Sequence, residues 1–293
     1  GRSHQYISND KEAGTKTMNF WRFFSKDREL RTIWRIEKGD RISYLIGAAH
    51  FFPYSFKRSL TRYIGNADTV LFEGPLDEDN MNKVVEQGTK GDNNSSLNGI
   101  LDASTIKEIN KLEYTISTHS YLGTYAMTFG RSTDNSLYEQ IKGQRPWMAF
   151  FYIWLYYRER NGWMYKLDMD AFKIANEMGK DFHFLEKIDE QIAALDAVPV
   201  ERIVNFLKKI NKWDGYAKRY VRYYLRGDLD GLLSSATEFP TVCESIIDKR
   251  DPILYERMKP FLEKGNTVAV VGITHIQGIR KRLLDDGYVV KQN

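Results

Sequence analysis

The sequence contains a single cysteine and no strong excess of charge of either sign. Because Cys243 is the one cysteine in 293 residues, an intrachain disulfide framework and the cysteine-rich zinc modules are excluded. The 43 lysines and arginines nearly balance 39 aspartates and glutamates, so we expect no nucleic-acid partner bound through bulk charge. Apolar residues make up 42% and charged residues 28%, which is typical of a folded globular protein and excludes disordered, collagen-like and coiled-coil chains.

The sequence also lacks an apolar segment long enough to direct secretion or to cross a membrane. Residues 1–17 are polar, and Gly1-Arg2-Ser3-His4 resembles a cloning scar, so we expect a flexible tail or a cloning remnant over residues 1–20. The longest apolar run, residues 148–157, is roughly half the length of a bilayer span. The sequence therefore does not indicate a cellular compartment, and we expect membrane association only if an upstream anchor has been removed.

Hydrophobic patterning predicts strands and helices at both ends of the chain and mostly helices between them. Near the start, we expect strands over 32–37, 41–46 and 69–72, with a helix over about 53–64. Near the end, we expect a helix over 252–263 and one over 277–285, with strands over 267–271 and 288–290. The middle should contain a helical insert over about 76–165, a strand over 182–185 and a helical segment over about 189–263.

Two of these units match each other. Gly47-Ala48-Ala49-His50 and Gly272-Ile273-Thr274-His275 each follow a strand and precede a helix and another strand. We therefore predict one α/β domain over residues 21–293, because parallel strands require helical crossovers. Its mainly parallel central sheet would be built from two pseudo-repeated strand–GxxH–helix–strand halves, with an α-helical insert as a cover.

Polar side chains stand at the carboxyl ends of four expected strands. These side chains are His50, Glu73, Glu186 and His275. Because ligands of α/β proteins bind at the rim where parallel strands end, we expect the four groups to meet there. Two histidines and a carboxylate suit a catalytic divalent metal that keeps open positions for water.

The Gly-x-x-His tetrapeptides have a functional and a structural interpretation. One copy is a weak signal, because a lone histidine after a strand is more often structural, but two copies in matching contexts favour a functional site. The histidines could hold a metal or act directly as acids and bases. Gly47 and Gly272 would let the backbone turn sharply and approach a ligand closely.

Other conspicuous residues favour simpler interpretations. His183 lies between two phenylalanines in an expected strand and should be buried or half-buried, whereas His119 lies in a polar turn and should be at the surface. The aromatic segment 147–157 is apolar on all sides, which predicts a buried helix, with the wall of a substrate cleft as the alternative. The G-x-S-x-G, H-E-x-x-H and P-loop patterns are absent.

The order of several short motifs resembles the TraB/GumN family, which includes the Tiki proteases. The resemblance extends from about residue 32 to 293. It rests on Gly47 and His50, Ala67-Asp68 before Glu73, Asp168 at a helix start, Gly179-Lys180, Leu185-Glu186, Glu190-Gln191, Arg250-Asp251, the block 270–278 and Gly287-Tyr288. Asp251 stands where an asparagine usually follows the arginine.

The resemblance implies a fold, an activity and a set of site residues. The fold would be similar to that of erythromycin esterase and the haem-binding ChaN proteins. Tiki proteins are metal-dependent proteases and bacterial relatives inactivate peptide pheromones, so a peptide or protein substrate is implied. His50, Glu73 and His275 would be the metal and catalytic groups. The supporting or substrate-binding residues would be Asp168, Glu186, Gln191, Arg250, Gly47 and Gly272.

We therefore expect a metal-dependent hydrolase, specifically a peptidase, that uses a divalent ion such as Mn, Co or Zn. Glu73 would be the third metal ligand or the general base beside His50 and His275. One alternative is a metal-free esterase-type hydrolase in which His50 is the base and Glu73 its partner. Another is a non-enzymatic protein of the same fold that binds haem or a small molecule.

Overall fold

A six-stranded sheet lies at the centre of the computed structural model, which describes residues 26–91, 96–112 and 136–293. The strand order is β4-β3-β5-β2-β1-β6. The strands are β1 (Ile33–Lys38), β2 (Arg41–Ala48), β3 (Thr69–Phe72), β4 (Asp181–Phe184), β5 (Thr267–Gly272) and β6 (Val289–Gln292). β2, β5, β3 and β4 run parallel, whereas β1 is antiparallel to β2 and β6. The expected α/β fold with a mainly parallel sheet is thus confirmed, while residues 1–20 and His119 lie outside the described residues.

Two pairs of helices pack on the sheet. α1 (Lys57–Asn66) packs on α7 (Leu167–Glu177), which contacts β3 and β5. α12 (Asp251–Lys264) packs on α13 (Ile276–Asp285) and contacts β2 and β5. β5 is buried along its whole length, as expected of a β-branched strand with a parallel neighbour on each side.

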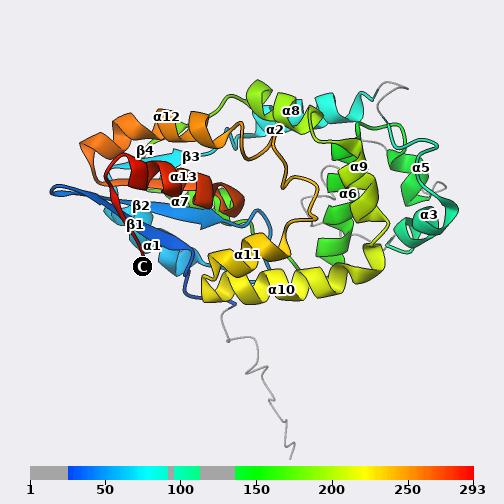
Figure 1. Cartoon of the computed structure of the whole chain (residues 1–293), viewed down its shortest axis with the longest axis horizontal. Helices are drawn as coiled ribbons and strands as arrows, with labels where there is room; N and C mark the ends of the chain where they lie inside the picture. Colours follow the sequence, from blue (N-terminus) through cyan, green and yellow to red (C-terminus); the bar gives the residue numbers. More distant parts are fainter. Residues whose placement is uncertain (1–25, 92–95, 113–135) are drawn as a thin grey trace, which may run out of the picture.

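A second group of helices lies away from the sheet. Figure 1 shows α3 (Ala103–Asn110), α5 (Leu137–Ile141), α6 (Pro146–Arg160) and α9 (Val200–Leu207) at the opposite end of the molecule. α10 (Trp213–Arg226) runs from this group to the sheet. The remaining elements are α2 (Glu78–Thr89), α8 (Ile188–Asp196), α11 (Leu229–Ser235) and the short 3-10 helices η2 (Ile210–Lys212) and η3 (Ile273–His275). None of the helices in the described ranges is long and apolar enough to span a membrane.

The two groups of elements have separate apolar clusters. The sheet cluster contains β-strand side chains such as Leu45 and Val270, and the helical cluster contains Trp154, Phe206 and Trp213. The two strand–GxxH–helix–strand units both lie in the sheet, and they are interleaved there because β5 lies between β3 and β2. This order brings Gly272 next to Ala48 at the carboxyl end of the sheet.

Two local expectations from the sequence are wrong. The first helix begins at Lys57 and not near residue 53, because the backbone of Phe52 exchanges hydrogen bonds of 2.8 and 3.1 Å with Tyr165. This pairing ties the loop after His50 to the segment before α7. His183 is 44% exposed, because it lies on the edge strand β4, where its ring packs at 4.6 Å on Phe261 of α12 but one side stays open, while Phe182 and Phe184 pack on Phe172.

Candidate functional site

A cavity of about 540 Å³ lies where the sheet cluster meets the helical cluster. The strand-end residues Phe72 and Val270 line one side, and Trp147, Phe151 and Trp154 of α6 line another. α6 is therefore both a largely buried helix and a cavity wall. The polar lining includes the strand-end groups His50, Glu73 and His275 together with Asp168 and Arg250. An apolar cavity with a few convergent polar groups is the usual form of a small-molecule or substrate site.

His50 is held by an aspartate from α7. Its Nδ1 lies 2.7 Å from Oδ2 of Asp168, so a neutral ring keeps its proton on Nδ1 and directs its Nε2 lone pair elsewhere. The side chain is 61% exposed and lines the cavity. Partial removal from water disfavours the charged imidazolium, but Asp168 and Glu73 outweigh this effect and raise the pKa of His50.

His275 has the same arrangement in a buried position. Its Nδ1 lies 2.7 Å from Oδ1 of Asp251, and the residue is only 2% exposed. Its Nε2 lies 3.6 Å from Oε1 of Glu73. Burial lowers the pKa of His275, but the charges of Glu73 and Asp251 outweigh burial and raise it to about 9.

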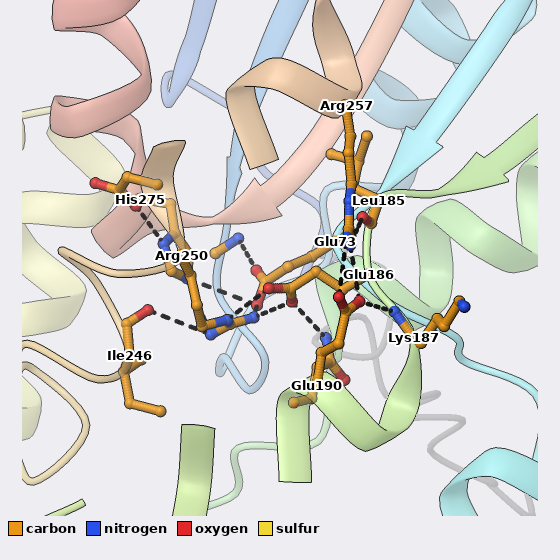
Figure 2. Close-up of polar contacts among 12 residues, drawn as sticks. Glu73, Leu185, Glu186, Lys187, Glu190, Ile246, Arg250, Arg257 and His275 are labelled. Atoms are coloured by element: carbon orange, nitrogen blue, oxygen red, sulfur yellow. Dashed lines mark hydrogen bonds and ion pairs between the residues drawn. The ribbon is translucent and has the colours of Figure 1, made fainter. Parts of the chain in front are cut away.

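Glu73 is fixed by a buried arginine, as Figure 2 shows. Nη2 of Arg250 donates to Oε1 of Glu73 at 2.5 Å, and Arg250 also forms a two-point contact with Glu186 at 2.5 and 2.9 Å. The other oxygen of Glu73 accepts a 2.7 Å hydrogen bond from the Gly272 N–H. Burial raises the pKa of Glu73, but His275 and Arg250 hold it well below its usual range. Glu73 is therefore ionised and oriented by partners on both oxygens.

The three strand-end groups surround the backbone of Gly272. A Cβ atom placed there would lie 3.1 Å from Oε2 of Glu73, 3.4 Å from Cδ2 of His275 and 3.8 Å from Nε2 of His50. A side chain at this position would thus enter the space that the three groups share. Gly47 differs, because a Cβ there would lie 2.3 Å from Cδ1 of Ile273, and Gly47 is not part of the cavity lining. Its role is to let β2 pack closely on η3.

The donor types in this set are ones that divalent metals commonly use. Two imidazoles and a carboxylate are common ligands, and each imidazole is held through its other nitrogen by a carboxylate, as in many metal sites. Within the described ranges, however, no three His, Cys, Asp or Glu side chains are arranged to hold a metal ion as they stand. Arg250 supplies the neighbouring positive charge, since it contacts Glu73 and lies 3.4 Å from Nε2 of His275.

The structure brings most of the expected site residues together and adds one. Glu186 binds Arg250, and Gln191 lies 3.4 Å from Glu186. Gln191 also packs against Gly74, where an added Cβ would displace the end of the Gln191 side chain. Sequence reasoning missed Asp251, although its position directly after Arg250 and the parallel with Asp168 and His50 were available signals.

These features define a class: an α/β protein whose strand-end histidines are each held by an aspartate beside a buried glutamate–arginine pair. The chain belongs to the TraB/PrgY/gumN family, whose model matches residues 32–292 and so includes all six strands described above. The resemblance seen in the motifs is thereby confirmed. The family contains Tiki-like metalloproteases. No curated protein matches the chain in sequence.

Proposed function

We propose that the protein is a metal-dependent hydrolase that cleaves peptide or protein substrates. The observation that carries the proposal is the matched pair of histidine–aspartate contacts beside Glu73. Membership of a family that contains metalloproteases supports the same reaction class. The apolar cavity next to these groups offers room for substrate side chains.

Each site residue has a role that follows from its surroundings. His50 and His275 would bind the ion through Nε2, while Asp168 and Asp251 hold the two rings in position. The low pKa of Glu73 suits a permanently charged third ligand better than a proton acceptor. A bound Mn, Co or Zn ion would act as a Lewis acid and lower the pKa of water. Arg250 keeps Glu73 in place and neutralises Glu186.

Metal content and peptide cleavage test this proposal together. We expect the purified protein, after loading with Mn, Co or Zn and dialysis, to retain about one ion per chain and to cleave a peptide library. His50→Ala and His275→Ala should lose both properties. His183→Ala is the matched control, because His183 is exposed on β4 and outside the cavity lining. Full metal content in both site variants would rule out the metal role.

A metal-free hydrolase is a second candidate, favoured by the contact of Arg250 with Glu73 and its approach to His275. In this case Nε2 of His50 would take the proton of the attacking water, and Asp168 would orient the ring. Glu73, which the sequence suggested as the partner of His50, contacts Arg250 and Gly272 instead. Activity that survives exhaustive chelation, with loss in His50→Ala, would favour this candidate over the first.

A further inference from the structure

A buried arginine in the cavity has no acidic partner among the described residues. Arg158 lies in the last turn of α6, is 8% exposed and lines the cavity. Its Nε donates to the backbone oxygen of Trp154 at 3.3 Å, and its guanidinium carbon lies 3.5 Å from the ring centre of Phe51. Within the described ranges no carboxylate forms an ion pair with it, although the charges of Glu159 and Asp168 act on it from a greater distance. Buried arginines are rare unless they are paired, so this one requires an explanation.

The terminal nitrogens of Arg158 are therefore open to a ligand. Burial lowers the pKa of Arg158 to about 9, so the group stays charged at neutral pH. A desolvated cation of this kind is stabilised when a negative group joins it. The planar fork of a guanidinium matches the two oxygens of a carboxylate.

The cavity that Arg158 lines also contains a second hydrogen-bond donor, Tyr220, and an apolar wall. Tyr220 of α10 lines the same cavity, and its ring stacks on Trp163 at 6.2 Å. Its hydroxyl has no hydrogen-bond partner in the described part of the chain. Burial raises the pKa of Tyr220, and the positive charge of Arg158 opposes part of this rise. His50 and Asp168 line the same cavity, so Arg158 shares it with the candidate catalytic groups.

We propose that Arg158 binds a carboxylate of the substrate, with the hydroxyl of Tyr220 as a second hydrogen-bond donor. The aromatic residues around it would hold an apolar side chain next to that carboxylate. This inference rests on the proposed peptide hydrolysis for its substrate, but carboxylate binding needs no turnover. Lys166 lines the same cavity, with its Nζ 5.0 Å from the ring centre of Phe51, so it adds a second positive charge to the wall that would receive the carboxylate.

Three small probes test the subsite by equilibrium binding. They distinguish a carboxylate at the end of a peptide from one on an acidic side chain. N-acetyl-phenylalanine carries a terminal carboxylate beside an aromatic side chain, and N-acetyl-phenylalanine amide carries none. N-acetyl-glutamyl-phenylalanine amide carries a side-chain carboxylate. We expect at least one of the acids to bind about 10–100-fold more tightly than the amide, as measured by titration calorimetry.

Arg158→Met should remove this preference and leave binding of the amide unchanged. Arg158→Lys should keep only part of it, because an ammonium offers no planar fork. Arg160→Met is the matched control, since Arg160 is exposed on the same helix, and it should bind all probes like the wild type. Arg158→Met should melt no lower than the wild type, because it removes an unpaired buried charge.

The outcomes separate this inference from the proposed function. Equal binding of the acids and the amide by the wild type, or an unchanged preference in Arg158→Met, would overturn the carboxylate subsite. A preference that depends on Arg158 in a protein that cleaves no peptide would support the subsite and count against the peptidase. Cleavage of peptides that does not depend on a carboxylate would support the peptidase and count against the carboxylate subsite.

Discussion

At the residue scale, each candidate histidine depends on one aspartate, but the two pairs lie in different environments. His50 is largely exposed to the cavity, so water can replace Asp168 as a partner of Nδ1. His275 is 2% exposed, and no water can easily take the place of Asp251. The same contact should therefore matter more for stability at His275 than at His50.

Substitution of Asp251 tests this difference. Asp251→Ala leaves the Nδ1–H of a buried imidazole without a partner, which should cost about 1–3 kcal/mol of unfolding free energy. Asp251→Asn keeps an acceptor oxygen and should cost less. The measurement is differential scanning calorimetry, with Asp248→Asn as the control, because Asp248 is exposed three residues away. An Asp251→Ala protein that melts with the wild type would show that this hydrogen bond contributes nothing to the fold.

The sequence predicts some site residues better than others. The sequence predicts His50, Glu73, Glu186 and His275 as site residues, because strand ends meet at one rim and this rule needs only the strand pattern. Asp251 could not be derived in this way, because it starts a helix and reaches His275 only once α12 has packed on α13. The sequence also does not predict that Arg158 is buried without an ion-pair partner, since a sequence does not say which charges lack partners.

At the element scale, a glutamate joins α8 to α12 beside the candidate site. The side chain of Glu190 accepts from the Lys187 N–H at 2.8 Å, which satisfies a free donor at the start of α8. It also forms a two-point contact with Arg257 of α12, at 2.7 Å for each bond. Arg257 further donates to the backbone oxygen of Leu185, next to Glu186. Glu190 thus holds the segment that positions the partner of Arg250.

Replacement of Glu190 should have a pH-dependent effect on stability. Hydrogen bonds from Arg257 and from the Lys187 N–H lower the pKa of Glu190 from 4.5 to about 2. A carboxylate with a lowered pKa in the folded state stabilises the protein above pH 4.5, and this contribution disappears as the pH falls through 2. Because the pair is partly exposed, Glu190→Gln should lower the Tm by only ~1–3 °C at pH 7.

The Tm difference between Glu190→Gln and the wild type should narrow steadily as thermal unfolding is repeated from pH 5 towards pH 2. Glu263→Gln is the control, because Glu263 is exposed on α12 and forms no ion pair within the described ranges. A difference that stays constant over this pH range would mean that the charge of Glu190 is not what stabilises α8.

Most strands and helices were predictable from local patterns, and the exceptions have a non-local cause. The tight turn at Lys38-Gly39-Asp40 joins two expected strands, with Lys38 paired to Arg41 and a positive φ of 60° at Gly39. α1 starts late because Phe52 pairs with Tyr165, a contact between segments far apart in the chain. Such backbone pairing has no signature in either segment alone.

At the scale of the whole molecule, α10 connects the two apolar clusters. Its first half contributes Trp213 and Ala217 to the helical cluster, and Tyr224 near its end belongs to the sheet cluster. The hydroxyl of Tyr224 also donates to the backbone oxygen of Gly47 at 2.6 Å. Because one continuous helix is shared, neither cluster should lose its packing while the other stays intact.

We therefore expect a single unfolding transition. Four of the six tryptophans lie in the helical cluster, so fluorescence reports mainly on that part. Hydrogen exchange of the β5 amides reports on the sheet. Urea titrations followed by both signals should share one midpoint, as in two-state unfolding. If the fluorescence midpoint falls at a much lower urea concentration than the midpoint for loss of β5 amide protection, the helical cluster unfolds independently.

The position of β5 in the sheet has a consequence for how the chain is made. β5 lies between β2 and β3, yet most of the helices separate it from them along the chain. A ribosome adding ~5–20 residues per second would need roughly 10–40 s to reach β5 after β3 has emerged. Until β5 is made, β1 pairs only with β2, and β3 has no partner until β4 follows it; isolated strand pairs of this kind are marginally stable in water. The apolar edges of β2 and β3 are open during that interval, which is when a nascent chain is most at risk of aggregation and most dependent on chaperones.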